Sequence, residues 1–326
     1  MQAVEAVTAR PSAVVRPLAS GPNLRGTLTL REVIDGYMAA YTGLDHSRTH
    51  RLAFWSEALG ELRIGELDSD HVADALELLA QQPAQRWVAK HRAPRVKSPS
   101  TLNRYRQALA AVLTWARHRR LTPKGWQHPV RELQGYTEGV ARTRFLSADE
   151  RERLLKVCRL SAWPKLHLLV LLAITTGARR GELLALRYRD LDLERATAHV
   201  RTSKNGEQRV LPLTDAVIAE IRRHGLGSDE ALLFASRWRP SQPHSVHAVW
   251  DSALRTARID NFKFHDLRHS CASYLAQSGA SLLEIADVLG HKSLRMTQRY
   301  SHLTIDTKRR LVHRVLGDIG AANKAA

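Results

Sequence analysis

The sequence has few cysteines and no long apolar run, and each shortage excludes a class of protein. Its 326 residues include only Cys158 and Cys271, too few for a disulfide framework. The longest uninterrupted apolar run, LLVLLAI at residues 168–174, is too short to cross a bilayer, and residues 1–26 hold no continuous hydrophobic segment like that of a signal peptide. These absences favour a protein of the reducing cytoplasm.

Acidic residues are also scarce relative to basic ones. The chain has 32 Asp and Glu residues against 50 Lys and Arg residues, a formal net charge of +18 at pH 7. Such an imbalance predicts an acidic partner and says nothing about the fold. Nucleic acid and anionic membrane are the usual acidic partners, and the short apolar runs favour nucleic acid. A merely soluble basic protein is the alternative.

The shortage is greatest between Leu78 and Arg131, where 54 successive residues include no Asp or Glu and 12 Lys or Arg. An ordinary solvated helix mixes both signs, because opposite charges at i,i+4 stabilise it. A polyanion would neutralise this run, so we interpret it as a DNA-contacting surface. The alternative is a loosely ordered basic loop at 86–98 followed by a charged helix. The candidate DNA contacts are Arg86, Lys90, Arg92, Arg95, Lys97, Arg104, Arg106, Arg117, Arg119 and Arg120.

The hydrophobic pattern predicts a mainly α chain with a small β-hairpin, divided into two domains. Residues 1–26 contain three prolines and little periodicity, which indicates a flexible arm. Residues 27–136 have helical periods, 137–146 have the mixed polarity of a linker, and 147–326 form a second domain that ends in a helix at about 303–326.

Short-range signals place several element ends. Capping boxes, in which Ser or Thr precedes Glu by three residues, predict helices that begin after Thr29, Ser147 and Ser281. Asn205-Gly206 lies between two alternating runs and predicts a hairpin, because both turn residues need positive φ.

Two candidate functional residues lie near the ends of predicted elements. Arg179 follows Gly177 at a helix junction, where a cation can face an anion, and Glu182 is close enough to orient it. Lys204 precedes the Asn-Gly turn, where it is a mobile charge and a candidate proton donor. The plain interpretations are a surface arginine paired with Glu182 and a solvated turn lysine.

A second group lies in HDLRH and the segment after it. His265 and Arg268, at i and i+3, share a helix face and can address one small anion. His291 is fixed just past a helix end, and Tyr300 has polar flanks that suit a nucleophile better than a core residue. His269 is one step round the helix, and we interpret it as structural. The alternative for the HDLRH histidines and arginine is a polar helix end that caps the preceding loop.

A metal site is not expected among these histidines. His265, His269, His291 and His302 are close in sequence, but no cysteine or carboxylate joins them at ligand spacing. The arginines between them disfavour a bound cation.

In this order, the motifs TGARRGELLAL, TSKNGEQRVLPL, HDLRH, LGHKS and TQRYSH resemble those of the tyrosine recombinase family, the phage integrases. The resemblance is firm over residues 145–305. It is looser over 27–135, where SPSTLNRYRQALAAVLTWA resembles the last helix of a core-binding domain. It implies a helical, SAM-like core-binding domain followed by a mixed α/β catalytic domain. Many phage integrases carry an arm-binding domain before these two, and the residues before Thr27 predict none.

The resemblance implies a site-specific recombinase that cuts and rejoins DNA through a 3′-phosphotyrosyl link, to integrate or excise a mobile element. Arg179 and Arg268 would clamp the phosphate oxygens, and His291 would add a hydrogen bond. Tyr300 would attack. The catalytic set is completed by His265, which would help remove the phenol proton, and Lys204, which would protonate the leaving 5′-oxygen. Glu182 would orient Arg179.

The resemblance implies no metal, ATP or other cofactor. It implies a homotetramer on two DNA duplexes, located with the nucleoid in the cytoplasm. A DNA-bending protein or an excision factor is a candidate partner. The C-terminal segment would dock on a neighbouring protomer through its apolar face, and docking on its own domain is the alternative. That face comprises Leu311, Val312, Val315, Leu316 and Ile319.

Other functions share the motifs. A Xer-like resolvase of chromosome or plasmid dimers, or a transposon recombinase, would use the same chemistry, and a type IB topoisomerase would relax DNA without exchange. A DNA-binding regulator on a recombinase scaffold would bind without cleavage. A basic nucleic-acid chaperone would show no site preference.

Overall fold

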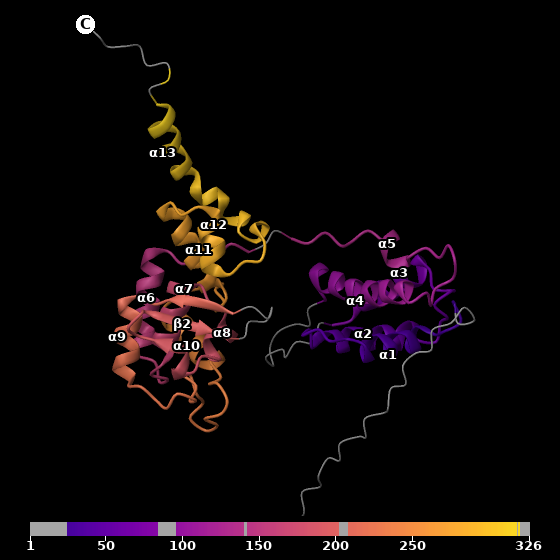
Figure 1. Ribbon diagram of the computed structural model, residues 1–326, viewed down its shortest axis with the longest axis horizontal. Coiled ribbons are helices and arrows are strands. Elements are labelled where there is room, and N and C mark those ends of the chain that lie inside the picture. The colour runs from indigo at the N-terminus through magenta and orange to yellow at the C-terminus, as the bar shows by residue number, and fades with distance from the viewer. Residues whose placement is uncertain (1–24, 84–95, 140–141, 202–207, 318, 320–326) are drawn as a thin grey trace, which may run out of the picture. The chain divides into compact units, whose positions relative to one another are not determined.

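The computed structural model describes residues 25–83, 96–139, 142–201, 208–317 and 319, and the chain divides into two compact units, residues 1–140 and 141–326 (Figure 1). No helix within the described ranges is long and apolar enough to cross a membrane. Five predicted site residues lie outside the described residues: Arg86, Lys90, Arg92, Arg95 and Lys204.

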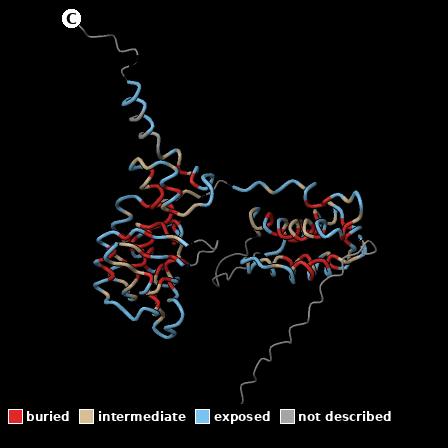
Figure 2. Tube along the Cα trace, viewed as in Figure 1, coloured by how far each residue is buried: buried red, intermediate tan, exposed pale blue. Residues whose placement is uncertain are grey.

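The first unit is helical. Its elements are α1 (Leu30–Ala39), α2 (Ser47–Leu59), α3 (Ser69–Gln81), α4 (Pro99–His118) and α5 (Pro129–Glu132). The predicted capping box at Thr29 is present, with Glu32 as its partner. Helices α1, α2 and α4 pack on one another, and Figure 2 shows their buried sides turned together. Trp55 of α2 is fully buried and donates from Nε1 to the Tyr105 carbonyl of α4 at 3.0 Å, so one side chain joins two helices of the core.

The second unit is built around an apolar helix. Its helices are α6 (Ala148–Arg159), α7 (Leu166–Thr176), α8 (Arg180–Leu184), α9 (Asp215–His224), α10 (His247–Thr256), α11 (Asp266–Ser278), α12 (Leu282–Leu289) and α13 (Ile305–Leu316), with 3₁₀ helices η2 (Tyr188–Asp190), η3 (Leu294–Met296) and η4 (Gln298–Thr304). Helix α7 is buried on nearly every side and packs against α6, α9 and α11. The capping boxes predicted at Ser147 and Ser281 are both present.

A small antiparallel sheet lies in the same unit, with strands β1 (Leu191–Asp192), β2 (Thr197–Val200) and β3 (Arg209–Pro212) in that order. Strand β2 pairs with β3 in a register that places Ala198 opposite Leu211. The two arms of the predicted hairpin are therefore confirmed, while its Asn205-Gly206 turn lies outside the described residues. The fold class is also confirmed: mainly helical with a small sheet.

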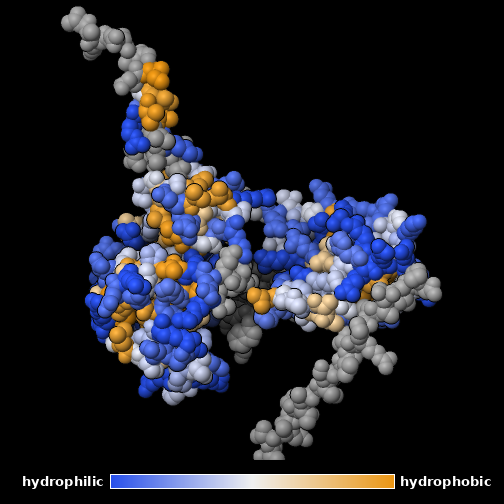
Figure 3. All heavy atoms as spheres, viewed as in Figure 1, coloured by the Kyte–Doolittle hydropathy of each residue, from blue (hydrophilic) through white to orange (hydrophobic). Residues whose placement is uncertain are grey.

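Helix α13 is the last helix among the described residues, and it exposes apolar side chains. Val312, Val315 and Leu316 are exposed, as is Ile319 beyond the helix. Figure 3 shows hydrophobic side chains gathered on α13. The predicted apolar face thus stays uncovered along the described part of this helix.

Candidate active site

The turn between α7 and α8 places Arg179 at the start of a short helix. Gly177 ends α7 with a φ of +61°, and a Cβ there would lie 2.3 Å from Leu289 Cδ2, so any other residue would strain this turn and displace Leu289 of α12. The Arg179 amide donates to Glu182 Oε2 at 2.9 Å, and its Nη1 donates to Oε1 at 2.7 Å. Glu182 therefore fixes both the backbone and the guanidinium of Arg179.

Glu182 is buried and also pairs with a second arginine, which is not among the residues predicted from the motifs. Arg209 donates from Nη2 to Glu182 Oε2 at 2.7 Å. Burial alone would raise the pKa of Glu182, but the hydrogen bonds of Arg179 and the charge of Arg209 hold that pKa below its usual value. One signal could have revealed Arg209: it shares the inward register of β3 with buried Leu211, where a cation is costly unless paired.

Arg268 lies in the first turn of α11 and is 4% exposed. Its Nη1 donates to the Gly177 carbonyl at 2.7 Å, while its Nη2 is buried without a hydrogen-bond partner among the described residues. Burial, followed by the charges of Arg179 and Arg209, lowers the pKa of Arg268 to about 10, and the charge of Glu182 opposes this shift only in part. A buried guanidinium with a spare donor among like charges favours a bound anion.

Tyr300, in η4, does not lie where its polar flanks suggested. The prediction that it is unsuited to a core is wrong, because it is 1% exposed and packs among buried residues that include Cys271 and Leu289. Helix η4 packs on α11, so one position of a polar segment faces inward. The phenol is satisfied there by a 2.5 Å hydrogen bond to Nδ1 of His269. Burial raises the pKa of Tyr300, against the charges of Arg299 and Arg268.

The histidines differ in exposure and in partners. His265 is exposed at the start of α11, and desolvation followed by the charge of Arg268 lowers its pKa. His269 is buried beside it, with the two rings edge to face at 5.3 Å between centroids. Burial and the charge of His265 lower the pKa of His269 to about 4, so its ring is neutral at neutral pH. No three His, Cys, Asp or Glu side chains among the described residues converge as a metal site.

His291 follows the end of α12. Gly290 has a φ of +62°, and the His291 amide donates to the Ala286 carbonyl at 2.8 Å, which fixes the histidine just past the helix. Its Nδ1 lies 2.7 Å from Oγ1 of buried Thr297. Burial and then the charges of Arg268 and Arg179 lower the pKa of His291 to about 4. The structure therefore gathers the described members of the predicted set within one electrostatic neighbourhood.

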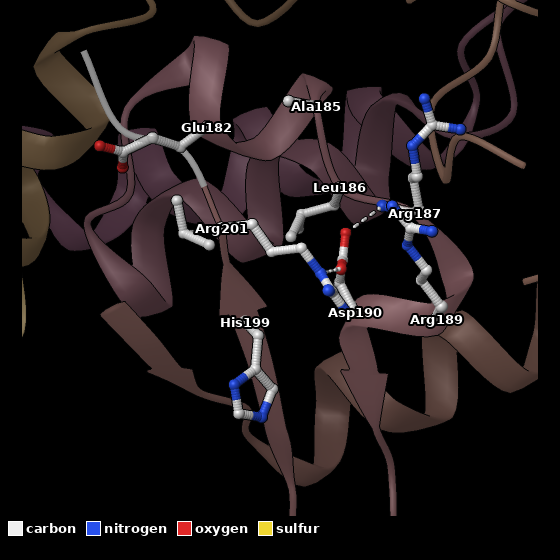
Figure 4. Close-up of a pocket in the computed structure, with 9 residues that line it drawn as sticks. Glu182, Ala185, Leu186, Arg187, Arg189, Asp190, His199 and Arg201 are labelled. Atoms are coloured by element: carbon white, nitrogen blue, oxygen red, sulfur yellow. Dashed lines mark hydrogen bonds and ion pairs between the residues drawn. The ribbon is translucent and has the colours of Figure 1, made fainter. Parts of the chain in front are cut away.

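Glu182 also stands at the rim of a cavity of about 160 Å³, drawn in Figure 4. The cavity holds a separate charge cluster, in which Arg201 pairs with buried Asp190 and the Arg187 amide donates to the same carboxylate at 2.9 Å. Figure 4 shows the Glu182 carboxylate turned away from this cluster. Glu182 therefore interacts with Arg179 and Arg209 and not with the charge cluster that lines the cavity.

The described members of the predicted DNA-contact set lie in the first unit. Lys97 is half-buried, its Nζ is 3.4 Å from the Gln82 and Pro83 carbonyls, and burial lowers its pKa. Arg106 is half-buried too, with a buried Nε. The remaining four are exposed on α4 or just after it: Arg104, Arg117, Arg119 and Arg120. All four side chains are exposed to solvent, and Arg119 also lies over the Trp115 ring, 5.2 Å from its centroid.

Comparison with known proteins agrees with this geometry. The model of the phage integrase family matches residues 144–306. The shufflon-specific DNA recombinase of Escherichia coli is 30% identical over 240 residues, which span 68% of this chain and 58% of that protein. Tyrosine recombinase XerC of Xanthomonas campestris pv. campestris is 29% identical and is covered over 87% of both chains. The Tn1549 transposon integrase, solved with a circular intermediate DNA, shares the fold with a TM-score of 0.68 at 17% identity, over 89% of this chain and 100% of that one. The chain belongs to the phage integrase family, the tyrosine recombinases.

Proposed function

We propose that the chain is a site-specific DNA recombinase of the integrase type, which cuts and rejoins DNA through a 3′-phosphotyrosyl intermediate. The observation that carries this proposal is the buried Arg268 guanidinium, whose Nη2 has no partner among the described residues. It is held within the field of Arg179 and Arg209, with Glu182 as the shared counter-charge. A DNA phosphate supplies both the missing acceptor and the missing negative charge.

Cleavage begins with attack by Tyr300 Oη on the phosphorus. A phosphotyrosyl bond forms, the bond to the 5′-oxygen breaks, and Lys204 protonates that oxygen as general acid. Arg179 and Arg268 stabilise the charge on the non-bridging oxygens with donors that are already fixed. We assign neutral His291 the tautomer whose Nδ1 accepts from the Thr297 hydroxyl, so that its Nε2–H is available to the same oxygens.

The phenol proton needs an acceptor before or during attack. The family resemblance implies His265 for this role, but the phenol contacts His269 at 2.5 Å. We assign the first transfer to His269 Nδ1, with exposed His265 beside it as the route to solvent. A pKa of about 4 makes His269 a weak base in the absence of DNA, and the charge of a bound phosphate raises it.

Rejoining reverses the chemistry. A 5′-hydroxyl of the partner duplex attacks the phosphotyrosine, so the energy of the cut bond is kept and no ATP is consumed. Exchange between two duplexes involves four strands and therefore four tyrosines, which makes the active assembly a tetramer on DNA. The exposed apolar residues of α13, among them Val312 and Val315, would dock on a neighbouring protomer. The exposed arginines of α4 would hold the duplex, at the nucleoid.

A second candidate function is the resolution of chromosome or plasmid dimers. The match to XerC over 87% of both chains favours it, because that relative is similar over both units and not only over the second. The chemistry is the same, so substrate choice separates the two functions. A resolvase recombines two copies of one site, whereas an integrase joins two different sites. A DNA-bending protein or excision factor would be needed by some integrases.

The test of the proposed function is covalent capture. The protein is mixed with DNA fragments from the flanks of its own gene, the reaction is stopped in detergent, and DNA that migrates with protein until protease is added is sequenced. Capture identifies the recombinase and its site. Tight, salt-sensitive binding without capture at any site would contradict the proposal and favour a DNA-binding regulator.

A further inference from the structure

Arg209 links its own strand to two other segments that carry the candidate active site. It is the first residue of β3, and its side chain is 14% exposed. Its Nη2 donates to Glu182 Oε2 at 2.7 Å, and its Nη1 donates to the Val288 carbonyl at 3.0 Å. One planar guanidinium therefore joins the sheet to α8 and to the last turn of α12.

Both acceptors adjoin residues of the proposed mechanism. Glu182 holds the backbone and the guanidinium of Arg179. Val288 lies three residues before His291, and the intervening Gly290 makes room for Arg209, since a Cβ there would lie 3.0 Å from Arg209 Cδ and 3.1 Å from its Nη1. Strand β3 also follows the segment that contains Lys204.

Accordingly, we propose that Arg209 is a positioning residue that locks Arg179 and His291 into one phosphate cage and anchors the strand after Lys204. This inference rests on the proposed recombinase function and adds a residue that the predicted catalytic set does not include. The cage has three arginines around one carboxylate, a repulsive arrangement that a phosphate relieves. A fork with two acceptors resists that repulsion, and a lysine at this position reaches only one of them.

The first test compares Arg209→Ala and Arg209→Lys with the control Arg189→Ala, an arginine of the same unit that pairs with Glu230 at the surface. The readouts are DNA affinity and the single-turnover rate of covalent complex formation on saturated DNA. We expect a rate loss of thirtyfold or more for Arg209→Ala and of about tenfold for Arg209→Lys, with affinity within threefold and the control unchanged. Equal losses of affinity and rate, or a wild-type rate in either variant, would overturn the proposal. If Arg209→Ala does not fold, Arg209→Lys decides.

A substrate with sulfur in place of the bridging 5′-oxygen shows which part of the cage depends on Arg209. A thiolate leaves without a proton, so we expect this DNA to restore cleavage to Lys204→Ala. Arg209→Ala should stay slow on it, because its defect lies in the cage. Full rescue of Arg209→Ala would confine the role of Arg209 to the Lys204 segment and contradict the proposed lock.

A melting cycle without DNA keeps this inference separate from the recombinase function. Arg209→Ala, Glu182→Gln and the double variant are compared with the wild type by thermal melting. If Arg209 and Glu182 act together, the melting temperature of the double variant should be no lower than that of the less stable single variant. Additive losses would contradict the bridge. Absence of covalent capture by the wild type would instead contradict the function and leave this result standing.

Discussion

The two units differ in whether their charged side chains are buried or exposed. The buried polar residues of the first unit among those described are uncharged or weakly basic: Asn103, Thr122 and His128. The second unit instead buries four carboxylates and an arginine: Glu182, Asp190, Glu220, Asp266 and Arg268. The exposed arginines of α4 stay hydrated until a partner binds, whereas the buried guanidinium of Arg268 is already desolvated. Binding and chemistry should therefore respond differently to substitution, pH and salt.

The largest expected effect tests the chemistry of the second unit. Tyr300→Phe keeps the ring in its buried cluster and removes the nucleophile, so covalent capture should fall by about 10⁴-fold or more. DNA affinity, which depends on exposed cations, should stay within about threefold. Capture is measured on a protein gel with labelled DNA.

The control for this variant is Tyr274→Phe. Its phenol donates to the Leu146 carbonyl at 3.0 Å, so its loss costs about 1 kcal/mol of stability but should leave capture intact. Capture that persists in Tyr300→Phe would show that another group attacks the phosphate.

The next effect tests whether the buried charge serves function at the expense of stability. Arg268→Met removes an oxyanion donor, and cleavage should fall by about 10²- to 10³-fold. The free energy of unfolding should stay level, because an apolar side chain relieves the repulsion from Arg179 and Arg209 and needs no partner for Nη2, which offsets the lost hydrogen bond to the Gly177 carbonyl. Single-turnover rates and urea unfolding measure the two quantities.

The control is an arginine of the same unit whose charge is satisfied. Arg142 pairs with buried Asp266 at 2.7 Å, and Arg142→Met should lower the free energy of unfolding by about 2 kcal/mol. A matching loss of stability in Arg268→Met would show that Arg268 is a structural residue, and the contrast between the two units would lose its functional meaning.

Acid should lower the stability of the second unit by protonating Glu220. Hydrogen bonding from Arg223, with the His167 contact at 3.0 Å, lowers the pKa of Glu220 from 4.5 to about 2. A lowered carboxylate pKa stabilises the folded state above the unfolded pKa, and this contribution is lost as pH falls from about 4.5 to about 2. Glu220→Gln should cost about 2 kcal/mol at pH 7, and its difference from the wild type should vanish near pH 2.

Urea unfolding across pH measures this difference. The control Glu57→Gln removes an exposed carboxylate of the first unit and should change stability by less than about 0.5 kcal/mol at every pH. A constant gap between Glu220→Gln and the wild type from pH 7 to pH 2 would mean that the charge of Glu220 does not stabilise the fold.

Local signals in the sequence predicted local structure well. The capping boxes at Thr29, Ser147 and Ser281 and the helix junction at Gly177 depend on a few neighbouring residues, so the sequence predicted them directly. The two arms of the hairpin followed from alternation and a turn dipeptide for the same reason.

The features that the sequence did not predict depend on contacts between segments far apart in the chain. The polar flanks of Tyr300 suggested exposure, but η4 packs on α11 and buries the ring 31 residues away from its partner His269. Arg209 reaches Val288, 79 residues along the chain, and no local pattern announces a contact at that separation. Motifs could therefore name most of the candidate site, while the packing that organises it needed the structure.

The smallest expected effect tests the outer charge of the first unit. Arg104→Ala or Arg117→Ala should weaken DNA binding about three- to tenfold near 0.15 M salt, because each lost phosphate contact releases fewer counterions. A plot of log affinity against log salt should lose about 0.9 from its slope per substitution, while cleavage of saturated DNA stays unchanged. Fluorescence anisotropy across a salt series measures the slope.

Arg63→Ala is the matched control, since Arg63 is an exposed arginine of the same unit that lies outside the acid-free segment. If it lowers the slope as much as Arg104→Ala does, net charge alone governs binding and α4 is not the DNA-facing side of this unit. If only the α4 variants lower the slope, position and not charge count decides contact. The exposed arginines would then hold the duplex while the buried arginines perform the chemistry.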